Sequence, residues 1–465
     1  MSAARDVARA AGAGRYKPYP AYKDSGVEWL GEIPAHWEMR RLKTVAAVQL
    51  SNVDKKSLEG QEGVRLCNYT DVYYHERITA DLDFMAATAT PDQLRRFTLR
   101  TGDVIITKDS ESWTDIAVPA VVAEDFPGVL CGYHLAHIRP KAVCHGPFLA
   151  RAFSAVGPRD QFQVAANGIT RFGLGGDAIA TGLFALPPEP EQRAIAAFLD
   201  RETARIDALV AKKERLIALL QEQRTALITR AVTKGLDPTV PMKDSGVEWL
   251  DQYPAHWTGL PLKRWVAIKI TDGPHETPEL VTEGVDFVSA EAVQDGRIDF
   301  EKRRGFISPD LHAYYCRKCR PVRDDILICK SGATTGKLAR VEVDVEFSVW
   351  SPLALVRANR SRVLPEFLEL ALGSEYVQKQ IRRTWSAGTQ PNISMGDLEQ
   401  LFVVAPQVQE QAEILAHVEQ ESGGFRLLGA RIREAIDRLK ELRTALISAA
   451  VTGKIDLREE GEETA

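Results

Sequence analysis

Apolar residues recur at helical spacing along two long stretches of this chain, 191–237 and 410–456. With steps alternating between four and three residues, seven of ten positions from Ile195 onward are apolar, and nine of ten from Ile414. A heptad pattern kept over four repeats and flanked by charged residues is typical of a coiled-coil seam. The pattern therefore predicts two long helices.

Proline and glycine mark where these helices should begin and end. Gly235 and Pro238 are expected to stop the first helix, because neither continues a helix easily. In the second helix, the adjacent pair Gly423-Gly424 predicts a weak point or a kink. The first helix should follow a group of three prolines, Pro187, Pro188 and Pro190.

The segments at 45–185 and 265–405 have a different pattern. Short apolar runs such as Val104–Thr107 and Ile326–Cys329 alternate with Gly, Pro and Asp, as strands alternate with turns. These segments predict two mixed, β-rich domains.

The chain is an internal repeat. Residues 23–37 return at 243–257 with twelve of fifteen positions identical, and the two helical stretches align without gaps. The β-rich segments diverge, yet TGDVIITKDS (101–110) still lies over RDDILICKSG (323–332). We expect an α+β fold in which two repeated, mixed β-rich domains are separated by two long antiparallel coiled-coil helices with pseudo-two-fold symmetry. The expected boundaries are a flexible leader at 1–18, domains at 19–185 and 238–405, helices at 186–237 and 406–457, and an acidic tail at 458–465.

Charge and cysteine content exclude little. The net charge is −5, but residues 299–340 hold ten Lys and Arg against five Asp and Glu, so a local patch could still attract DNA. Six cysteines are too sparse for a disulfide framework, and Cys316 and Cys319, with His312 nearby, lack the second ligand pair of a zinc site. No run of 18 apolar residues or signal-peptide core stands out, which favours the cytoplasm.

Two pairs of loops carry candidate DNA-binding residues. The loop SGATTGK (331–337) has the wrong spacing for an ATP-binding loop, so it is a tight turn or a contact to the DNA backbone. Its counterpart in the first half carries an aromatic residue, and the later loops at 167–174 and 387–394 carry Asn, Gln and Arg, which pair with bases. The candidates are Lys108, Ser110, Ser112, Trp113, Asn167, Thr170, Arg171, Lys330, Ser331, Thr334, Thr335, Lys337, Gln390 and Asn392.

The repeated motif KDSGVEWL…PAHW favours packing over chemistry. Its tryptophans are large apolar anchors, and its histidines, His36 and His256, are more often satisfied packing residues than ligands. No catalytic tetrapeptide, nucleotide-binding glycine loop, Ser/His/Asp arrangement or metal-carboxylate cluster stands out. We therefore expect no active site in this chain.

Besides the internal repeat, the chain carries three motifs, SGVEWLGEIPAHW (25–37), GDVIITK (102–108) and P-x-x-E-Q-x-x-I (188–195). In the repeat and these motifs it resembles the specificity subunit of a Type I restriction–modification system. The resemblance implies two target recognition domains, each reading one half of a bipartite DNA sequence. It also implies that the helices set the spacer and dock two methyltransferase subunits, joined by endonuclease/translocase subunits. S-adenosylmethionine, ATP and Mg would belong to those partners, and this chain would hold no cofactor or metal.

On this interpretation the apolar helix positions are also docking candidates: Ile206, Leu209, Leu216, Leu220, Leu428, Ile432, Leu439 and Leu442. The alternative is a non-catalytic coiled-coil scaffold or regulatory protein that binds only protein partners. A self-sufficient nuclease or methyltransferase would need motifs that we do not find.

Overall fold

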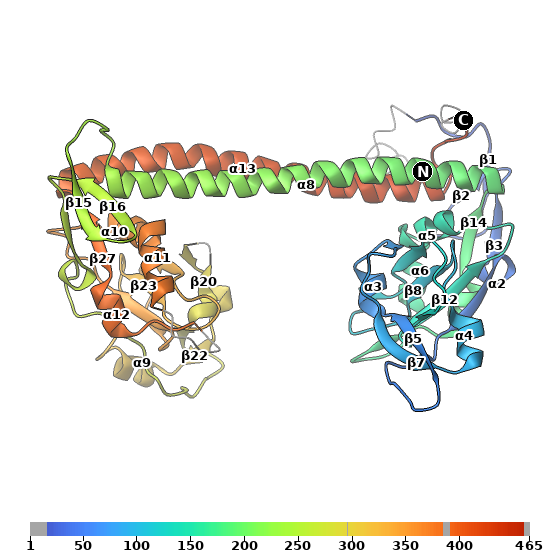
Figure 1. Ribbon diagram of the computed structural model, residues 1–465, viewed down its shortest axis with the longest axis horizontal. Coiled ribbons are helices and arrows are strands. Elements are labelled where there is room, and N and C mark those ends of the chain that lie inside the picture. The colour runs from blue at the N-terminus through green and yellow to red at the C-terminus, as the bar shows by residue number, and fades with distance from the viewer. Residues whose placement is uncertain (1–15, 295, 385–390, 460–465) are drawn as a thin grey trace. The chain divides into compact units, whose positions relative to one another are not determined.

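The computed structural model describes residues 16–294, 296–384 and 391–459. The chain forms two compact units, unit 1 with residues 1–213 and 433–465 and unit 2 with residues 214–432. Both units share the two long helices, α8 (Glu189–Lys234) and α13 (Val408–Val451) (Figure 1). No helix within the described ranges is both long and apolar enough to cross a membrane.

The two helices pair antiparallel within each unit. In unit 1 the start of α8, including Ile195 and Leu199, shares a core with Leu446 near the end of α13. In unit 2 the end of α8, at Val232, shares a core with Ile414 near the start of α13. The paired long helices predicted from the heptads are confirmed.

The helix ends agree with the sequence in part. Gly235 ends α8 in a left-handed conformation (φ +70°), as expected, but Pro190 lies inside the first turn and does not precede it. Proline is tolerated there because the first turn needs no N–H donor. Helix α13 is unbroken over 44 residues, so the pair Gly423-Gly424 does not interrupt it.

The repeated motif anchors each unit to the start of a long helix. His36 Nε2 and Trp37 Nε1 contact the carboxylate of Glu191 at 2.9 and 3.1 Å. In unit 2 His256 and Trp257 contact Glu410 in the same way, both at 2.9 Å. The packing interpretation of this motif is confirmed for Trp37 and Trp257, which are 0% and 1% exposed, but it is wrong for Trp29, which is 42% exposed. The two copies of the motif form hairpins, β1 (Tyr22–Asp24) with β2 (Glu32–Pro34) and β15 (Met242–Val247) with β16 (Leu250–Pro254).

Unit 1 contains a five-stranded and a three-stranded sheet, both of mixed direction. Their orders are β4-β12-β8-β10-β6 and β11-β5-β7. The strands are β4 (Ala46–Leu50), β5 (Glu62–Cys67), β6 (Arg77–Ile78), β7 (Met85–Ala89), β8 (Val104–Thr107), β10 (Pro119–Val122), β11 (Val129–Cys131) and β12 (Leu135–Pro140). Around them lie β3 (Glu38–Arg41), paired with β14 (Leu183–Leu186), and the helices α2 (Leu42–Val45), α3 (Tyr69–Tyr73), α4 (Pro91–Phe97), α5 (Gly146–Ser154), α6 (Asp160–Ala165) and α7 (Gly176–Thr181).

Unit 2 repeats this order with different lengths. Its main sheet runs β18-β26-β23-β24 and its second sheet β22-β19-β25. The strands are β18 (Thr271–Asp272), β19 (Val285–Val288), β22 (Gly305–Ile307), β23 (Ile326–Cys329), β24 (Leu338–Arg340), β25 (Phe347–Val349) and β26 (Leu353–Val356). The other elements are β17 (Thr258–Pro261), paired with β27 (Phe402–Ala405), β20 (Val293–Gln294), paired with β21 (Arg297–Ile298), and α9 (Pro309–Tyr315), α10 (Pro365–Gly373), α11 (Glu375–Arg383) and α12 (Met395–Gln400).

A buried ion pair holds the central strand of each main sheet. Asp103, one residue before β8, accepts hydrogen bonds from Nε and Nη2 of Arg139 at 2.8 and 2.7 Å. Asp325, one residue before β23, accepts the same two bonds from Arg357, both at 2.7 Å. Both aspartates are only 1% exposed, so the pairing compensates the cost of burying their charge. The repeated frame therefore extends into the divergent segments.

Candidate nucleic-acid interface

The two candidate loops of unit 1 meet at the end of strand β8. After Lys108 the chain forms β9 (Asp109–Ser110), which pairs with β13 (Phe172–Gly173) from the later loop. The backbone N–H of Leu174 also donates to the carbonyl of Lys108 at 2.8 Å. Residues about sixty positions apart in the chain thus form one surface.

The loops of unit 2 meet in the same way. The N–H of Ile393 donates to the carbonyl of Lys330 at 2.8 Å, and Ser331 forms a bridge with Asn392. Thr335 Oγ1 donates to the carbonyl of Pro391 at 3.1 Å. Gln390, another candidate, lies outside the described residues.

Lys108 and Lys330 are placed differently from the free cations that the sequence suggested. Each is 8% exposed and directly follows the central strand of its sheet. Lys108 Nζ lies 2.6 Å from Asp109 Oδ2, and Lys330 Nζ lies 2.5 Å from Asp272 Oδ2. Their charge is compensated inside the protein, so they hold the loops in place. A phosphate contact from either lysine stays a prediction.

Each of these carboxylates also contacts a histidine. Asp109 Oδ2 is 3.1 Å from His134 Nδ1, and Asp272 Oδ2 is 3.2 Å from His275 Nε2. Burial alone would raise the pKa of Asp109, but hydrogen bonds from Lys108 and His134 outweigh it and hold that pKa below its ordinary value. The pKa of Asp272 is lowered in the same way, with Lys318 and Lys330 as donors. Both carboxylates are therefore charged acceptors at neutral pH.

Arg171 is an exposed cation of the unit 1 surface. Its Nη2 lies 3.0 Å from Nδ1 and 3.3 Å from Nε2 of His134, and no carboxylate of the described ranges pairs with it. It lines a cavity of about 530 Å³ together with Lys55, Tyr69, Tyr73, Tyr74 and Ser110. Tyr69 and Tyr73 stack with ring centroids 5.5 Å apart, and the Tyr69 hydroxyl donates to Ser110 Oγ at 3.2 Å.

The remaining candidates differ in exposure. Ser110 is buried, Ser112, Ser331, Thr334 and Thr335 are half-buried, and Trp113, Asn167, Thr170, Lys337 and Asn392 are exposed. Sequence reasoning missed Tyr69, Tyr73, Tyr74, His134 and His275. The run NYTDVYYH (68–75), with three tyrosines in six residues, was a signal for the first three. Ile169, also missed, is 94% exposed between Asn167 and Arg171.

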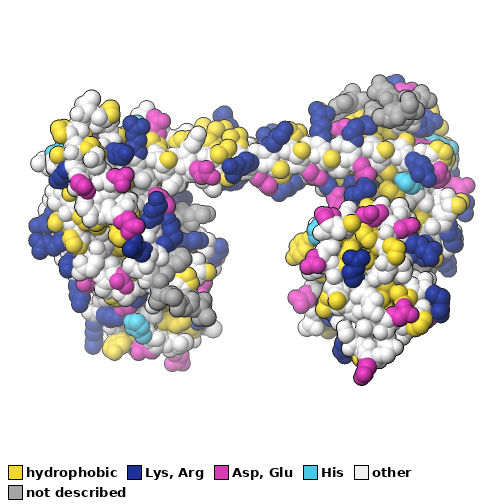
Figure 2. All heavy atoms as spheres, in the orientation of Figure 1, with side chains coloured by type: hydrophobic (Ala, Val, Ile, Leu, Met, Phe, Trp, Pro, Cys, Tyr) yellow, Lys and Arg dark blue, Asp and Glu magenta, His cyan; other side chains and the backbone are white. Residues whose placement is uncertain are grey.

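The helix positions proposed for docking separate into two groups. Ile206 and Ile432 are each 5% exposed, so they belong to the helix-packing seam and are not available as a surface. Leu220, Leu439 and Leu442 are half-buried. Exposed leucines, which include two that the sequence did not single out, are Leu209, Leu216, Leu219, Leu427 and Leu428. Figure 2 shows hydrophobic side chains among charged ones along these helices.

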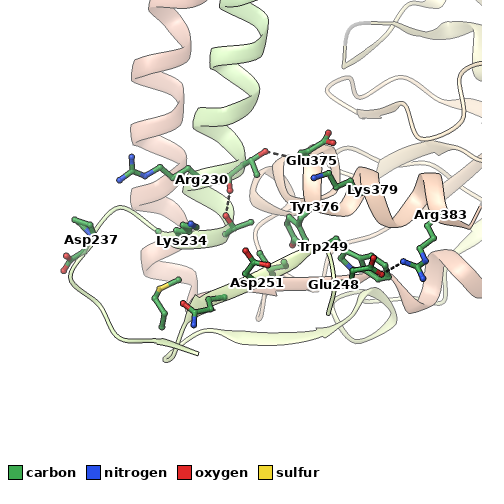
Figure 3. A pocket seen from close by; sticks show the side chains of 17 residues that line it. Arg230, Lys234, Asp237, Glu248, Trp249, Asp251, Glu375, Tyr376, Lys379 and Arg383 are labelled. Atoms are coloured by element: carbon green, nitrogen blue, oxygen red, sulfur yellow. Dashed lines mark hydrogen bonds and ion pairs between the residues drawn. The ribbon is translucent and has the colours of Figure 1, made fainter. Parts of the chain in front are cut away.

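A larger cavity, of about 830 Å³, lies in unit 2 where α8 ends beside α11 and the hairpin β15–β16 (Figure 3). The guanidinium of Arg383 pairs with Glu248 and lies 5.3 Å above the ring of Trp249. The Glu375 N–H donates to Thr229 Oγ1 at 3.2 Å. The first contacts tie the repeated motif to α11, the last ties α8 to α11, and the cavity is lined by equal numbers of acidic and basic side chains.

The cysteines do not form a chemical centre. His312 Nδ1 lies 2.9 Å from Ser348 Oγ, and Cys316 Sγ lies 3.5 Å from His312 Nε2. Burial raises the pKa of the Cys319 thiol to about 12, so that thiol is protonated at neutral pH. Among the residues that the structure describes, no group of three His, Cys, Asp or Glu could hold a metal ion.

Comparisons with known proteins agree with the resemblance seen in the motifs. No protein-family model matches the chain. It is 26% identical over 282 residues to the Type I restriction enzyme EcoBI specificity subunit of Escherichia coli, an alignment that covers 59% of this chain and 58% of that one. It is 20% identical over 443 residues to the EcoKI specificity subunit of Escherichia coli strain K12, covering 91% and 90%.

A solved structure from work on complex assembly and conformational transition of the type I R-M system has the same fold. It matches with a TM-score of 0.63 and 19% identity, covering 90% of this chain and 98% of that one. The relatives and the fold thus confirm the resemblance to Type I specificity subunits.

Proposed function

We propose that this chain is the DNA-specificity subunit of a Type I restriction–modification complex, in which each unit reads one half of a bipartite target. One observation carries the proposal. Both units join two distant loops at the end of the central strand, through the same backbone bond of 2.8 Å, but give those loops different side chains. One frame with two sets of side chains suits two different half-sites.

The exposed loop residues have the chemistry of base and phosphate recognition. Arg171 and Asn392 can donate to or pair with base edges, and Lys337 can contact phosphate oxygens. Tyr74 is 72% exposed and Trp113 is 52% exposed, which leaves their rings free for apolar contacts with DNA. The chain itself contributes recognition and no catalytic step.

The exposed leucines of α8 and α13 suit a protein partner. Leu216, Leu219, Leu427 and Leu428 all belong to unit 2 and are 39–57% exposed. Apolar side chains grouped on a helix surface gain free energy when a partner covers them. We assign this surface to methyltransferase subunits, which would bring S-adenosylmethionine chemistry, while ATP-driven cleavage with Mg would belong to endonuclease subunits.

The test is DNA binding by the chain assembled with its methyltransferase. Affinity for a specific duplex should fall steeply as salt rises, because phosphate contacts release counterions. The target itself would come from single-molecule methylome sequencing of a host that expresses the system. A bipartite methylated sequence supports the proposal, whereas an assembled complex without affinity for DNA would refute it.

A further inference from the structure

A lysine, an aspartate and a histidine form the same contact set at the end of the central strand in both units. In unit 1 these are Lys108, Asp109 and His134, and in unit 2 Lys330, Asp272 and His275. We propose that the Lys–Asp pair is the base on which each unit mounts its reading side chain, so that His134 presents Arg171 to a guanine of the first half-site and His275 itself reads the second. This inference rests on the proposed function.

The two sets did not arise from the sequence repeat alone. Lys108 and Lys330 occupy matching positions, but their partners do not. Asp109 directly follows its lysine, whereas Asp272 lies on strand β18, 58 residues before Lys330. The same arrangement built from non-matching residues points to a shared task more strongly than inheritance of one frame does.

A largely buried lysine makes each aspartate a fixed point. The side chains of Lys108 and Lys330 are both 10% exposed, while that of Asp272 is 7% exposed and that of Asp109 is 21% exposed. A charge in such a place is costly unless it is paired and hydrogen-bonded, so the carboxylate cannot leave its lysine freely. A histidine that donates to this carboxylate is therefore held in one orientation.

The orientation of His134 determines what it offers Arg171. Because Nδ1 lies 3.1 Å from the Asp109 carboxylate, which can only accept, Nδ1 carries the proton. Nη2 of Arg171 lies 3.0 Å from Nδ1 and 3.3 Å from Nε2, so the guanidinium packs against the imidazole ring and is not in line with the Nε2 lone pair. His134 thus acts on DNA through another residue, as a positioning residue.

Arg171 is left with free donors. Among the described residues its hydrogen-bond contacts, both to His134, use only Nη2, so Nη1 and Nε remain available. Arg139 shows the opposite case, since Asp103 accepts from both Nε and Nη2 of its guanidinium. An exposed, pre-oriented guanidinium without a carboxylate partner matches the O6 and N7 acceptors of guanine in the major groove.

His275 provides the counterpart in unit 2. Its side chain is 72% exposed, while its Nε2 contacts Asp272. Asp272 is held by two lysines, Lys330 and Lys318, at 2.5 and 2.6 Å. One ring nitrogen is therefore held by a fixed carboxylate, and the exposed remainder of the ring is available to a base.

The experiment uses the full chain assembled with its methyltransferase subunits and the target defined by methylome sequencing. Each guanine of the first half-site is replaced in turn by 7-deazaguanine, which lacks the N7 acceptor, and affinity is measured for each duplex. In the wild type, one replacement should weaken binding about tenfold or more. In Arg171→Ala the same replacement should have no further effect.

His134 variants separate positioning from general stability. His134→Ala should reduce the loss of affinity caused by the 7-deazaguanine replacement that Arg171 detects. The affinity of this variant for duplexes altered in the second half-site, and the salt dependence of its binding, should stay as in the wild type. His134→Gln should restore the effect of that replacement, since a planar amide can still donate to Asp109 and lie against the guanidinium of Arg171. Arg40→Ala, which removes another exposed arginine of unit 1, serves as the control and should behave as the wild type. His275→Ala should relax discrimination in the second half-site only.

The inference is overturned if the first half-site has no guanine, or if each 7-deazaguanine replacement has the same effect in the wild type and in Arg171→Ala. It also fails if His134→Ala weakens all duplexes equally. In these cases the proposed function would still stand, provided that the complex binds its bipartite target in a salt-dependent way.

Discussion

At the scale of single residues, the buried aspartates before the central strands explain how the two β-rich segments keep one frame despite their divergence. Asp103 and Asp325 each accept two bonds from one arginine and are almost fully buried. Removing one partner of such a pair leaves an uncompensated charge, which is far more costly than the pair is worth.

We therefore expect Arg139→Met to destabilise unit 1 by about 3–5 kcal/mol. The side chain of Asp103 is 1% exposed and would remain buried without its main donor. Lys56→Met is the matched control, because Lys56 and Asp54 form a pair whose side chains are 77% and 61% exposed. That pair should contribute no more than about 1 kcal/mol. Urea denaturation of both variants gives the comparison, and similar losses would contradict the prediction.

The pH dependence of stability should reveal the contribution of two paired carboxylates, Asp103 and Asp272. Burial alone would raise the pKa values of Asp103 and Asp272, but their hydrogen bonds to Arg139 and His137, or to Lys318 and Lys330, lower both. A carboxyl whose pKa is lower in the folded state adds stability that is complete above the unfolded pKa of about 3.9 and is lost as pH falls through the folded value. The unfolding free energy should thus decline below about pH 4. Asp103→Asn should show a shallower decline in pH-dependent denaturation, and an equal slope would refute this assignment.

Residue chemistry was only partly visible in the sequence. Arg171 was predicted from side-chain type, and it lies on the exposed surface. In the sequence, Lys108 and Lys330 cannot be told from lysines that bind phosphate. Their burial depends on tertiary packing, which the sequence pattern does not reveal. His134 and His275 had no local signal, since their importance depends on Asp109, 25 residues from His134, and on the Asp272–Lys330 pair.

At the scale of elements, periodicity was most reliable where the chain is strongly patterned. The predicted strands Val104–Thr107 and Ile326–Cys329 are β8 and β23. Helix α13 continues through Gly423-Gly424 because packing along a long seam outweighs a local propensity of about 1 kcal/mol per glycine. The sheet orders could not be predicted, because strand neighbours depend on contacts far apart in the chain.

Replacing either of these two glycines by alanine should stabilise the protein. Nothing lies within 4 Å of a Cβ added at Gly423 or Gly424, and both are helical. Alanine at either position should stabilise unit 2 by about 0.5–1 kcal/mol. Gly453→Ala is the opposite case, since its φ is +71° and a Cβ would lie 2.2 Å from Pro34 Cδ. The midpoint temperature of thermal unfolding should rise for the two variants at Gly423 and Gly424 and fall for Gly453→Ala.

The exposed leucines give a second prediction at this scale. Leu216→Gln combined with Leu428→Gln should weaken co-purification with the methyltransferase while leaving thermal unfolding nearly unchanged, because both side chains are more than 40% exposed. Ile206→Gln should instead lower thermal stability, since Ile206 is buried in the seam. If the double variant still co-purifies with the methyltransferase as the wild type does, these leucines do not form the docking surface.

At the scale of the whole molecule, each unit has hydrophobic cores of its own. The cores that contain Phe148 and Phe97 use only residues of unit 1, and those that contain Phe367, Phe347 and Phe287 use only residues of unit 2. A change of side chains in one β-rich segment therefore need not repack the other unit. Structural independence of this kind should appear as independent reading of the two half-sites.

Replacing residues 45–185 with the recognition domain of another specificity subunit should therefore change one half of the methylated target and leave the other half intact. The new domain must keep apolar residues facing Ile195, Leu199 and Leu446, which share a core with the present domain. Methylome sequencing of a host that expresses the hybrid reads out both halves at once. If both halves changed, the units would not read independently; if neither changed, unit 1 would not contact bases, and Arg171 would have no guanine to read.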